Sequence, residues 1–187
     1  MKRLDVIPFL LVLCGLLIGV TAQAFGYTVS DFGTRIEDMY REYAAQMPKR
    51  NRIYVCTNDC MGDPRFFRYS GKDIARLRAM IPTTDPVSER AGIAKSVKWM
   101  ENRIGHTGNS CTGSALNVTS HILVLHANGI LKHHRPHKPM GKLCLPKWPH
   151  WSGMIRANDR SGTVWAIDTY LDKSRVIVQP FSEWYCR

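Results

Sequence analysis

The sequence predicts an α+β fold in which helices come first and an antiparallel β-meander follows. Two observations carry this prediction. Apolar residues recur every three or four positions through much of the first two thirds of the chain, whereas β-rich runs separated by turn residues fill the last 37 positions. At 187 residues the length suits one compact domain, and 44% hydrophobic with 22% charged residues excludes a disordered chain, a collagen or a multi-span membrane protein.

The first 24 residues have the three parts of a secretory signal peptide. A positive start, Met1 to Arg3, precedes an apolar run of 15 residues, 6–20, and the small-residue cleavage pattern Ala22-Gln23-Ala24. A membrane-spanning helix needs about 20 residues, so an uncleaved anchor is the weaker alternative. We therefore expect a mature domain over 25–187, secreted or periplasmic, with no membrane contact after cleavage.

Four segments before residue 130 have helical periodicity. A helix is expected after Ser30 and before Pro48, and a capping box at Ser70 and Asp73 begins the second. The third ends at Gly105, and the last runs from Cys111 to the stop signal Asn128-Gly129. The apolar positions that define these helices are Phe32, Ile36, Tyr40, Tyr43 and Met47; Ile74, Leu77 and Ile81; Ile93, Val97, Met100 and Ile104; and Ala115, Val118, Ile122 and Leu125.

The strands are expected mainly at the end of the chain. Arg52–Cys56 alternates weakly and indicates one short early strand, and four prolines between 132 and 149 indicate a long functional loop. The meander itself is predicted over 151–156, 163–168 and 175–178.

The charge balance points to an anionic partner or surface. Lys and Arg number 26 against 15 Asp and Glu, and signal cleavage lowers the net charge from +11 to +10. The basic residues are scattered without interleaved aromatics, so no nucleic-acid partner is expected. The loop histidines His133, His134 and His137 lie near Cys144, but their spacing is poor and cationic side chains interleave them. We interpret this tract as a solvated basic loop and expect no metal and no cofactor.

The mature chain keeps five cysteines, an odd number in an oxidising compartment. One thiol is therefore left over or pairs between chains. Cys56 with Cys60 and Cys144 with Cys186 are the favoured disulfides, which leaves Cys111 free. The sequence alone cannot choose among the three pairings of these four residues.

Cys111 has the setting of a reactive thiol. It lies in the first turn of a predicted helix, where the helix dipole favours the thiolate. A thiolate nucleophile needs a base and a group that orients the base. His150 begins the first long strand of the meander and Asp168 ends the next, so a hairpin would bring them together at one edge. Trp148 and Trp151 flank His150 and are candidate walls of a substrate cleft.

These residues, in this order, resemble the transglutaminase-like fold within the papain-like group of cysteine enzymes. The matching segments are Lys95 to Ile104 with Trp99, Cys111-Thr-Gly-Ser-Ala115, Gly129-Ile130, His150-Trp151 and Trp165-Ala-Ile-Asp168. They cover residues 88–170, under half the chain, and Thr112 stands where the family has glycine. The resemblance implies a papain-like core with Cys111 as nucleophile, His150 as base and acid, and Asp168 as the group that orients His150. It also implies an oxyanion hole made by the Cys111 backbone N–H and an upstream donor, for which Asn109 is the candidate.

The function that follows is a secreted peptidase, amidase or transglutaminase-type acyltransferase acting on peptides, proteins or cell-wall peptides. Two alternatives stay open. One is a cell-wall peptidase of the NlpC/P60 type, which commonly has a second histidine where this chain has Asp168. The other is a non-catalytic basic module that binds an anionic envelope surface. Thiol reactivity at Cys111 discriminates the enzymes from the module.

Overall fold

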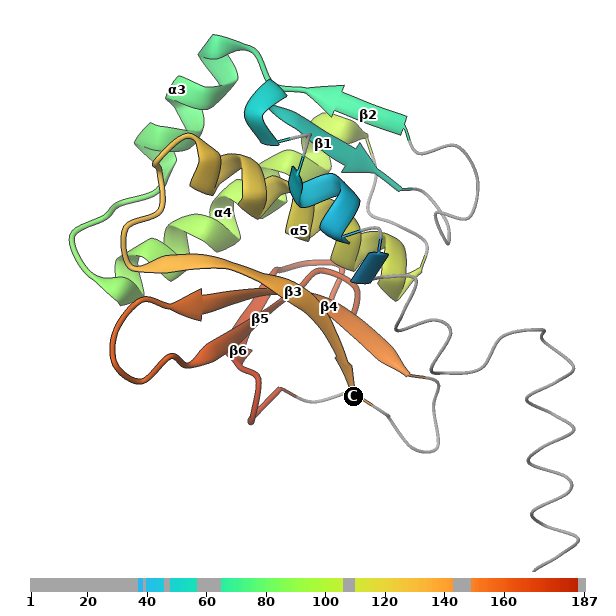
Figure 1. Ribbon diagram of the computed structural model, residues 1–187, viewed down its shortest axis with the longest axis vertical. Coiled ribbons are helices and arrows are strands. Elements are labelled where there is room, and N and C mark those ends of the chain that lie inside the picture. Colours follow the sequence, from blue (N-terminus) through green and yellow to red (C-terminus); the bar gives the residue numbers. More distant parts are fainter. Residues whose placement is uncertain are drawn as a thin grey trace, which may run out of the picture. The chain divides into compact units, whose positions relative to one another are not determined.

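The computed structural model describes residues 37–38, 40–45, 48–56, 65–105, 110–142 and 149–184 (Figure 1). The chain divides into two compact units, Met1–Ile36 and Glu37–Arg187. All of the described residues belong to the second unit, so the predicted signal peptide lies outside them.

The predicted α+β class is confirmed. Residues 40–45 are helical, which agrees with the central part of the first predicted helix. After them come the 3-10 helix η1 (Pro48–Arg50), β1 (Arg52–Val55), β2 (Arg65–Arg68), α3 (Gly71–Met80), α4 (Pro86–Ile104), α5 (Cys111–Ala127), β3 (His134–Lys142), β4 (His150–Ala157), β5 (Val164–Asp168) and β6 (Ile177–Pro180). None of the helices within the described ranges is both long and apolar enough to cross a membrane.

The expectation that the helices precede the strands is wrong. Strands β1 and β2 pair antiparallel as a two-stranded sheet before α3 begins. The sequence pattern indicated β1 but gave no sign of β2. Of the four residues of β2, only Phe67 is partly buried, where it packs against the main core. A strand with so little burial has almost no hydrophobic alternation to detect.

The expectation of a long loop over 132–149 is also wrong in its first half. Residues His134–Lys142 form β3, the edge strand of a four-stranded antiparallel sheet with the order β3-β4-β5-β6. Proline removes a ladder hydrogen bond and is therefore confined to edge strands and bulges. Both conditions hold, because β3 lies at the edge and its register shifts between His137 and Met140.

The histidine tract is not a solvated loop either. His134 is fully buried, and its Nδ1 lies 2.9 Å from Oε1 of Glu89, a buried residue in the first turn of α4. The same carboxylate accepts hydrogen bonds from the backbone N–H groups of Lys132 and His133. An Arg90 nitrogen lies 3.2 Å from Nε2 of His134, so Nε2 acts as the acceptor and the Nδ1–H is donated to Glu89. This buried polar cluster fixes the start of β3 on α4.

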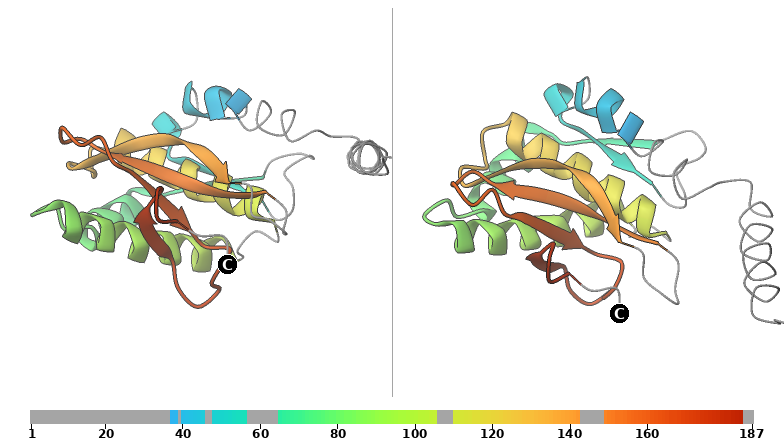
Figure 2. Two further views of the ribbon diagram at one scale, coloured as in Figure 1. Left: turned by 90° about the horizontal axis from the view of Figure 1, so that it is seen from below. Right: turned by 60° about the horizontal axis from the view of Figure 1, so that its bottom comes forward.

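Helix α5 is the central element of the described unit. Every residue from Thr112 to Leu125 is buried. The four-stranded sheet lies along one side of the helix (Figure 2), and β4 approaches it closely at Gly153, where an added Cβ would lie 2.5 Å from Cγ1 of Val118. Just after β1, the backbone N–H and C=O of Cys56 are both hydrogen-bonded by the side chain of Asn117 of α5.

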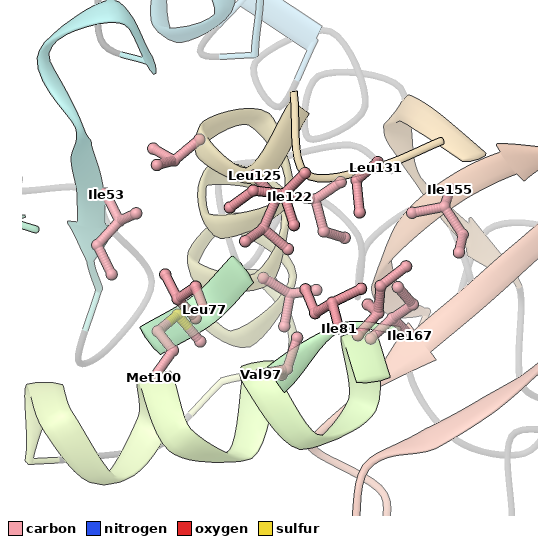
Figure 3. Close-up of a cluster of buried hydrophobic side chains, with 14 of the residues drawn as sticks. Ile53, Leu77, Ile81, Val97, Met100, Ile122, Leu125, Leu131, Ile155 and Ile167 are labelled. Carbon is pink, nitrogen blue, oxygen red and sulfur yellow. The ribbon is translucent and has the colours of Figure 1, made fainter. Parts of the chain in front are cut away.

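The main hydrophobic core joins α5 to the other layers (Figure 3). It unites residues of β1, the three helices and the sheet, including Ile53, Leu77, Val97, Ile122 and Ile155. Several of these are the positions whose helical spacing predicted the helices. A smaller cluster, with Met154, Ala166 and Trp184 as its buried residues, lies elsewhere on the sheet.

The predicted start of the second helix at Ser70 and the predicted end of the third at Gly105 are confirmed. Ser70 and Asp73 form a reciprocal capping box at the start of α3. Gly105 ends α4 in the left-handed conformation, with a φ of 78°. Helix α4 begins earlier than its apolar spacing indicated, at Pro86, because Asp85 accepts hydrogen bonds from the N–H groups of Val87 and Ser88.

Candidate active site

Cys111 is the first residue of α5, where the sequence placed it. The helix begins here because Ser110 is its N-cap and accepts a hydrogen bond from the Gly113 N–H. The first N–H groups of a helix have no partner within the helix and carry the positive end of its dipole. Since α5 is buried in the core from Thr112 to Leu125, the thiol is held at a fixed point.

His150 and Asp168 are brought together by the pairing of β4 with β5. Gly153 lies opposite Ile167 in this antiparallel pair. Continuing the register places Asp168 opposite Ser152, two residues from His150 and on the same face of the sheet. The predicted hairpin therefore gives the predicted juxtaposition.

The Asp168 carboxylate binds the imidazole directly. Its Oδ2 lies 2.6 Å from Nε2 of His150, and the two residues are 2% and 6% exposed. Oδ1 accepts hydrogen bonds from the backbone N–H groups of Tyr170 and Leu171 at 2.8 and 3.1 Å. A carboxylate held on both oxygens cannot rotate freely, so it fixes the plane of the imidazole ring.

The Cys111 thiol lies on the other side of this imidazole. The sulfur lies 3.8 Å from the Pro149 carbonyl oxygen, and His150 is close enough to lower the pKa of the thiol; because Nε2 is engaged by Asp168, Nδ1 is the ring nitrogen left for the sulfur. Burial alone would raise the pKa of the thiol. The hydrogen bond and charge of His150, the Trp151 backbone N–H and the Thr112 hydroxyl oppose this, and the net effect lowers the thiol pKa below its ordinary value.

The pKa of the His150 imidazole is shifted in the opposite direction. Burial lowers the pKa of His150, but its hydrogen bonds to Asp168 and Cys111 and the two negative charges outweigh burial and raise the pKa to about 9. A lowered thiol pKa beside a raised imidazole pKa shifts the equilibrium toward the thiolate–imidazolium pair. This pair is the nucleophile and proton donor that acyl transfer through a cysteine requires.

The other predicted site residues fare differently. Trp151 is partly buried, and it packs so closely that a Cβ at Gly141 would lie 2.9 Å from its ring. Its backbone N–H, rather than its side chain, is the group that reaches the thiol. Asn109 and Trp148 lie outside the described residues.

The cysteine predictions are tested only in part. Cys111 is a free thiol. Cys56 is disulfide-bonded, with a partner outside the described residues. Cys60, Cys144 and Cys186 also lie outside them, so the favoured pairs Cys56–Cys60 and Cys144–Cys186 stay predictions. Within the described ranges, no three His, Cys, Asp or Glu side chains gather as metal ligands.

Three residues at the site were not singled out by sequence reasoning. Trp184 donates from Nε1 to Oδ2 of Asp168 at 3.0 Å, and Tyr170 lies against the His150 ring with centroids 5.6 Å apart. Thr112, noted only as a departure from the family glycine, places its hydroxyl on the thiol. The one available signal was position, since Thr112 adjoins Cys111 and Tyr170 follows Asp168 by two residues.

Comparisons with family models, with curated proteins and with solved structures found no match to the chain. The site's chemistry therefore rests on its own geometry.

Proposed function

We propose that this chain is a cysteine-dependent amide-bond enzyme with Cys111, His150 and Asp168 as its triad. One observation carries the proposal: a free thiol at the start of a buried helix has its pKa lowered by an imidazole whose Nε2 lies 2.6 Å from a buried carboxylate. The same arrangement fits a transglutaminase-like, papain-like core, which the order of the sequence motifs suggests.

The first half-reaction forms a thioester. The Cys111 thiolate attacks the carbonyl carbon of an amide, and the carbonyl π electrons move onto oxygen. The Cys111 backbone N–H at the start of α5 is the donor that would stabilise that oxyanion. When the tetrahedral intermediate collapses, the C–N bond breaks and the imidazolium of His150 gives its Nδ1 proton to the leaving amine.

The second half-reaction consumes the thioester. Neutral His150 removes a proton from water or from an amine acceptor, which attacks the thioester carbonyl and releases the Cys111 thiolate. Water gives a peptidase or amidase, and an amine gives a transglutaminase. Asp168 stays ionised throughout, holding Nε2–H and stabilising the imidazolium.

The rest of the proposal concerns where the enzyme works and on what. The signal-like segment before residue 25 favours a secreted or periplasmic enzyme, and the net charge favours substrates near an anionic envelope surface. The substrate class is a peptide, a protein or a cell-wall peptide. Asp168 in third position, in place of a second histidine, favours the transglutaminase-like type over the NlpC/P60 type.

The decisive experiment measures thiol reactivity and turnover together. We expect an alkylating probe to label Cys111 of the native, non-reduced chain quickly at neutral pH, and His150→Ala to slow that labelling while the thiol remains present. Cys111→Ala should abolish both hydrolysis of quenched fluorescent peptides and incorporation of a fluorescent amine, with an unchanged thermal melting curve. A Cys111 that reacts no faster than an ordinary thiol, with no turnover in either assay, would leave the non-catalytic basic module as the better account.

A further inference from the structure

We propose that the C-terminal segment Phe181–Trp184 is a positioning clamp, in which Trp184 fixes the Asp168 carboxylate and Lys142 fixes Trp184. This inference rests on the proposed function, because it assigns positioning residues to the same triad. It is carried by hydrogen bonds, ring contacts and burial.

Trp184 shares its acceptor with the candidate base. Its indole Nε1–H donates to Oδ2 of Asp168 at 3.0 Å, and Nε2 of His150 contacts the same oxygen at 2.6 Å. The oxygen that orients the imidazole is thus itself oriented by the indole. Since Trp184 is 1% exposed and Asp168 is 2% exposed, water is excluded from this pair of bonds.

The indole also contacts the imidazole directly. The rings of Trp184 and His150 have centroids 5.2 Å apart and an interplanar angle of 34°. Trp184 packs in one cluster with Met154 and Ala166 of the sheet and with Phe181, whose ring stacks on it at 5.8 Å. The indole is therefore seated by packing as well as by its hydrogen bond.

Lys142 holds this segment from the end of β3. Its ammonium donates to the Trp184 carbonyl at 3.0 Å and to the Ser182 carbonyl at 3.4 Å, and it lies 4.7 Å from the centre of the Phe181 ring. Lys142 is also the cross-strand partner of His150 in the β3–β4 pair. Lys142 thus connects β4, which carries His150, to the segment Phe181–Trp184, which orients the Asp168 carboxylate.

The clamp has a consequence for the proton affinity of His150. Among the described residues, the titratable groups that interact with this ring are Cys111 from α5, Asp168 from β5 and the phenol of Tyr170, and the charged Lys142 is the cross-strand partner of His150. The partial positive charge of the indole N–H lies against the carboxylate oxygen and partly offsets its negative charge. It therefore reduces the attraction of Asp168 for the imidazolium. Without that donor, the carboxylate would hold the proton on His150 more tightly.

The test is an NMR titration of the His150 ring in the full mature chain with its disulfides intact. Trp184→Phe keeps an aromatic ring and removes the N–H, so we expect the pKa of His150 to rise by about half a pH unit. Trp165→Phe is the matched control, because it also removes an indole but packs against the main core, where Arg90 lies 3.8 Å over its ring. It should leave the His150 titration unchanged.

Lys142→Met tests the second step and keeps the clamp falsifiable if the tryptophan variant folds poorly. This variant should raise the pKa of His150 by a smaller amount, and the rise should disappear when Trp184→Phe is already present. A rise that persists in the double variant would mean that the ammonium acts on His150 through its charge alone, and would overturn the role of Lys142 in the clamp.

The clamp and the proposed function fail in different ways. A wild-type pKa raised as described, with no upward shift in Trp184→Phe, overturns the clamp and leaves the triad standing. A wild-type His150 that titrates at its ordinary value overturns both. If the pKa values of His150 in the wild type and the variants behave as expected but no amide assay shows turnover, the result counts against the proposed function alone.

Discussion

At the scale of single residues, the chemistry of the site depends on how completely one carboxylate is bound. Asp168 accepts four hydrogen bonds: two from backbone N–H groups on Oδ1, and two on Oδ2 from the rings of His150 and Trp184. A buried carboxylate is tolerated only with such partners, because desolvation would otherwise drive it to protonate. The same four hydrogen bonds hold the Asp168 carboxylate in one position, and the carboxylate in turn fixes the orientation of the imidazole.

Replacing Asp168 by Asn should therefore cost far more activity than stability. The amide oxygen can keep the two backbone N–H donors, but its NH₂ group then faces the Trp184 N–H and takes the place of the anion. We expect kcat/KM to fall by about three to four orders of magnitude, the scale known for amide replacement of a triad acid. The cost in unfolding free energy should be about 1–3 kcal/mol, the penalty of an unsatisfied buried group.

The pH dependence supplies a second readout for this variant. Asp168 raises the pKa of His150, so its removal should lower that pKa from about 9 and move the alkaline limb of the activity profile to lower pH. Asp159→Asn is the matched control, because Asp159 lies in the exposed β4–β5 turn, where an amide oxygen can replace the carboxylate oxygen that binds Ser161. An Asp168→Asn enzyme as active as this control would remove Asp168 from the triad.

At the scale of elements, periodicity located the helices, and the candidate triad followed from the helix start and the hairpin. Cys111 opening α5, His150 opening β4 and Asp168 closing β5 were all predictable, because each lies at the end of an element with a strong local signal. Strand β3 was not, since its Pro136 and Pro139 indicate a loop unless the edge position and the bulge are known. The buried Glu89–His134 contact spans 45 residues and has no local signature.

The contact between α5 and β4 is the element-scale feature that sets the distance from thiol to imidazole. Gly153 allows it, since an added Cβ would lie 2.5 Å from Cγ1 and 2.9 Å from Cβ of Val118. We expect Gly153→Ala to lower the free energy of unfolding by about 1–3 kcal/mol through overpacking, measured by chemical denaturation. Because the variant pushes β4 away from α5, it should also slow alkylation of Cys111.

A control and a partial rescue sharpen this prediction. Gly71→Ala, at the start of α3, meets nothing within 4 Å and should be neutral or slightly stabilising. Adding Val118→Ala to Gly153→Ala removes the 2.5 Å conflict but leaves the one at 2.9 Å, so it should restore only part of the alkylation rate. If Gly153→Ala and Gly71→Ala had the same free energy of unfolding, the close approach of α5 to β4 at Gly153 would not limit the stability of the fold.

At the scale of the whole molecule, the odd cysteine count gains a physical meaning from the structure. Cys111 is free, and Cys56 is oxidised while its backbone is held on both sides by the buried Asn117 side chain. With five cysteines in the mature chain, one thiol stays unpaired, and that thiol is Cys111, whose pKa His150 lowers. In an oxidising compartment, a second unpaired thiol would be oxidised to a disulfide with Cys111, so a chain that keeps one reactive thiol there needs its other cysteines already paired.

We therefore expect the exported chain to begin at Phe25 and to take up one alkyl group, on Cys111, before reduction and four more after reduction and unfolding. Non-reducing peptide mapping should find Cys56 with Cys60 and Cys144 with Cys186. Once Cys111 is blocked, reduction of the Cys144–Cys186 bridge should lower the free energy of unfolding by about 2–4 kcal/mol. Reduction of the Cys56–Cys60 bridge should lower it by less, because loop-closure entropy grows with loop length. A bridge that includes Cys111, or a Cys56 joined to Cys144 or Cys186, would contradict this arrangement; the first outcome would also remove the nucleophile from the proposed mechanism.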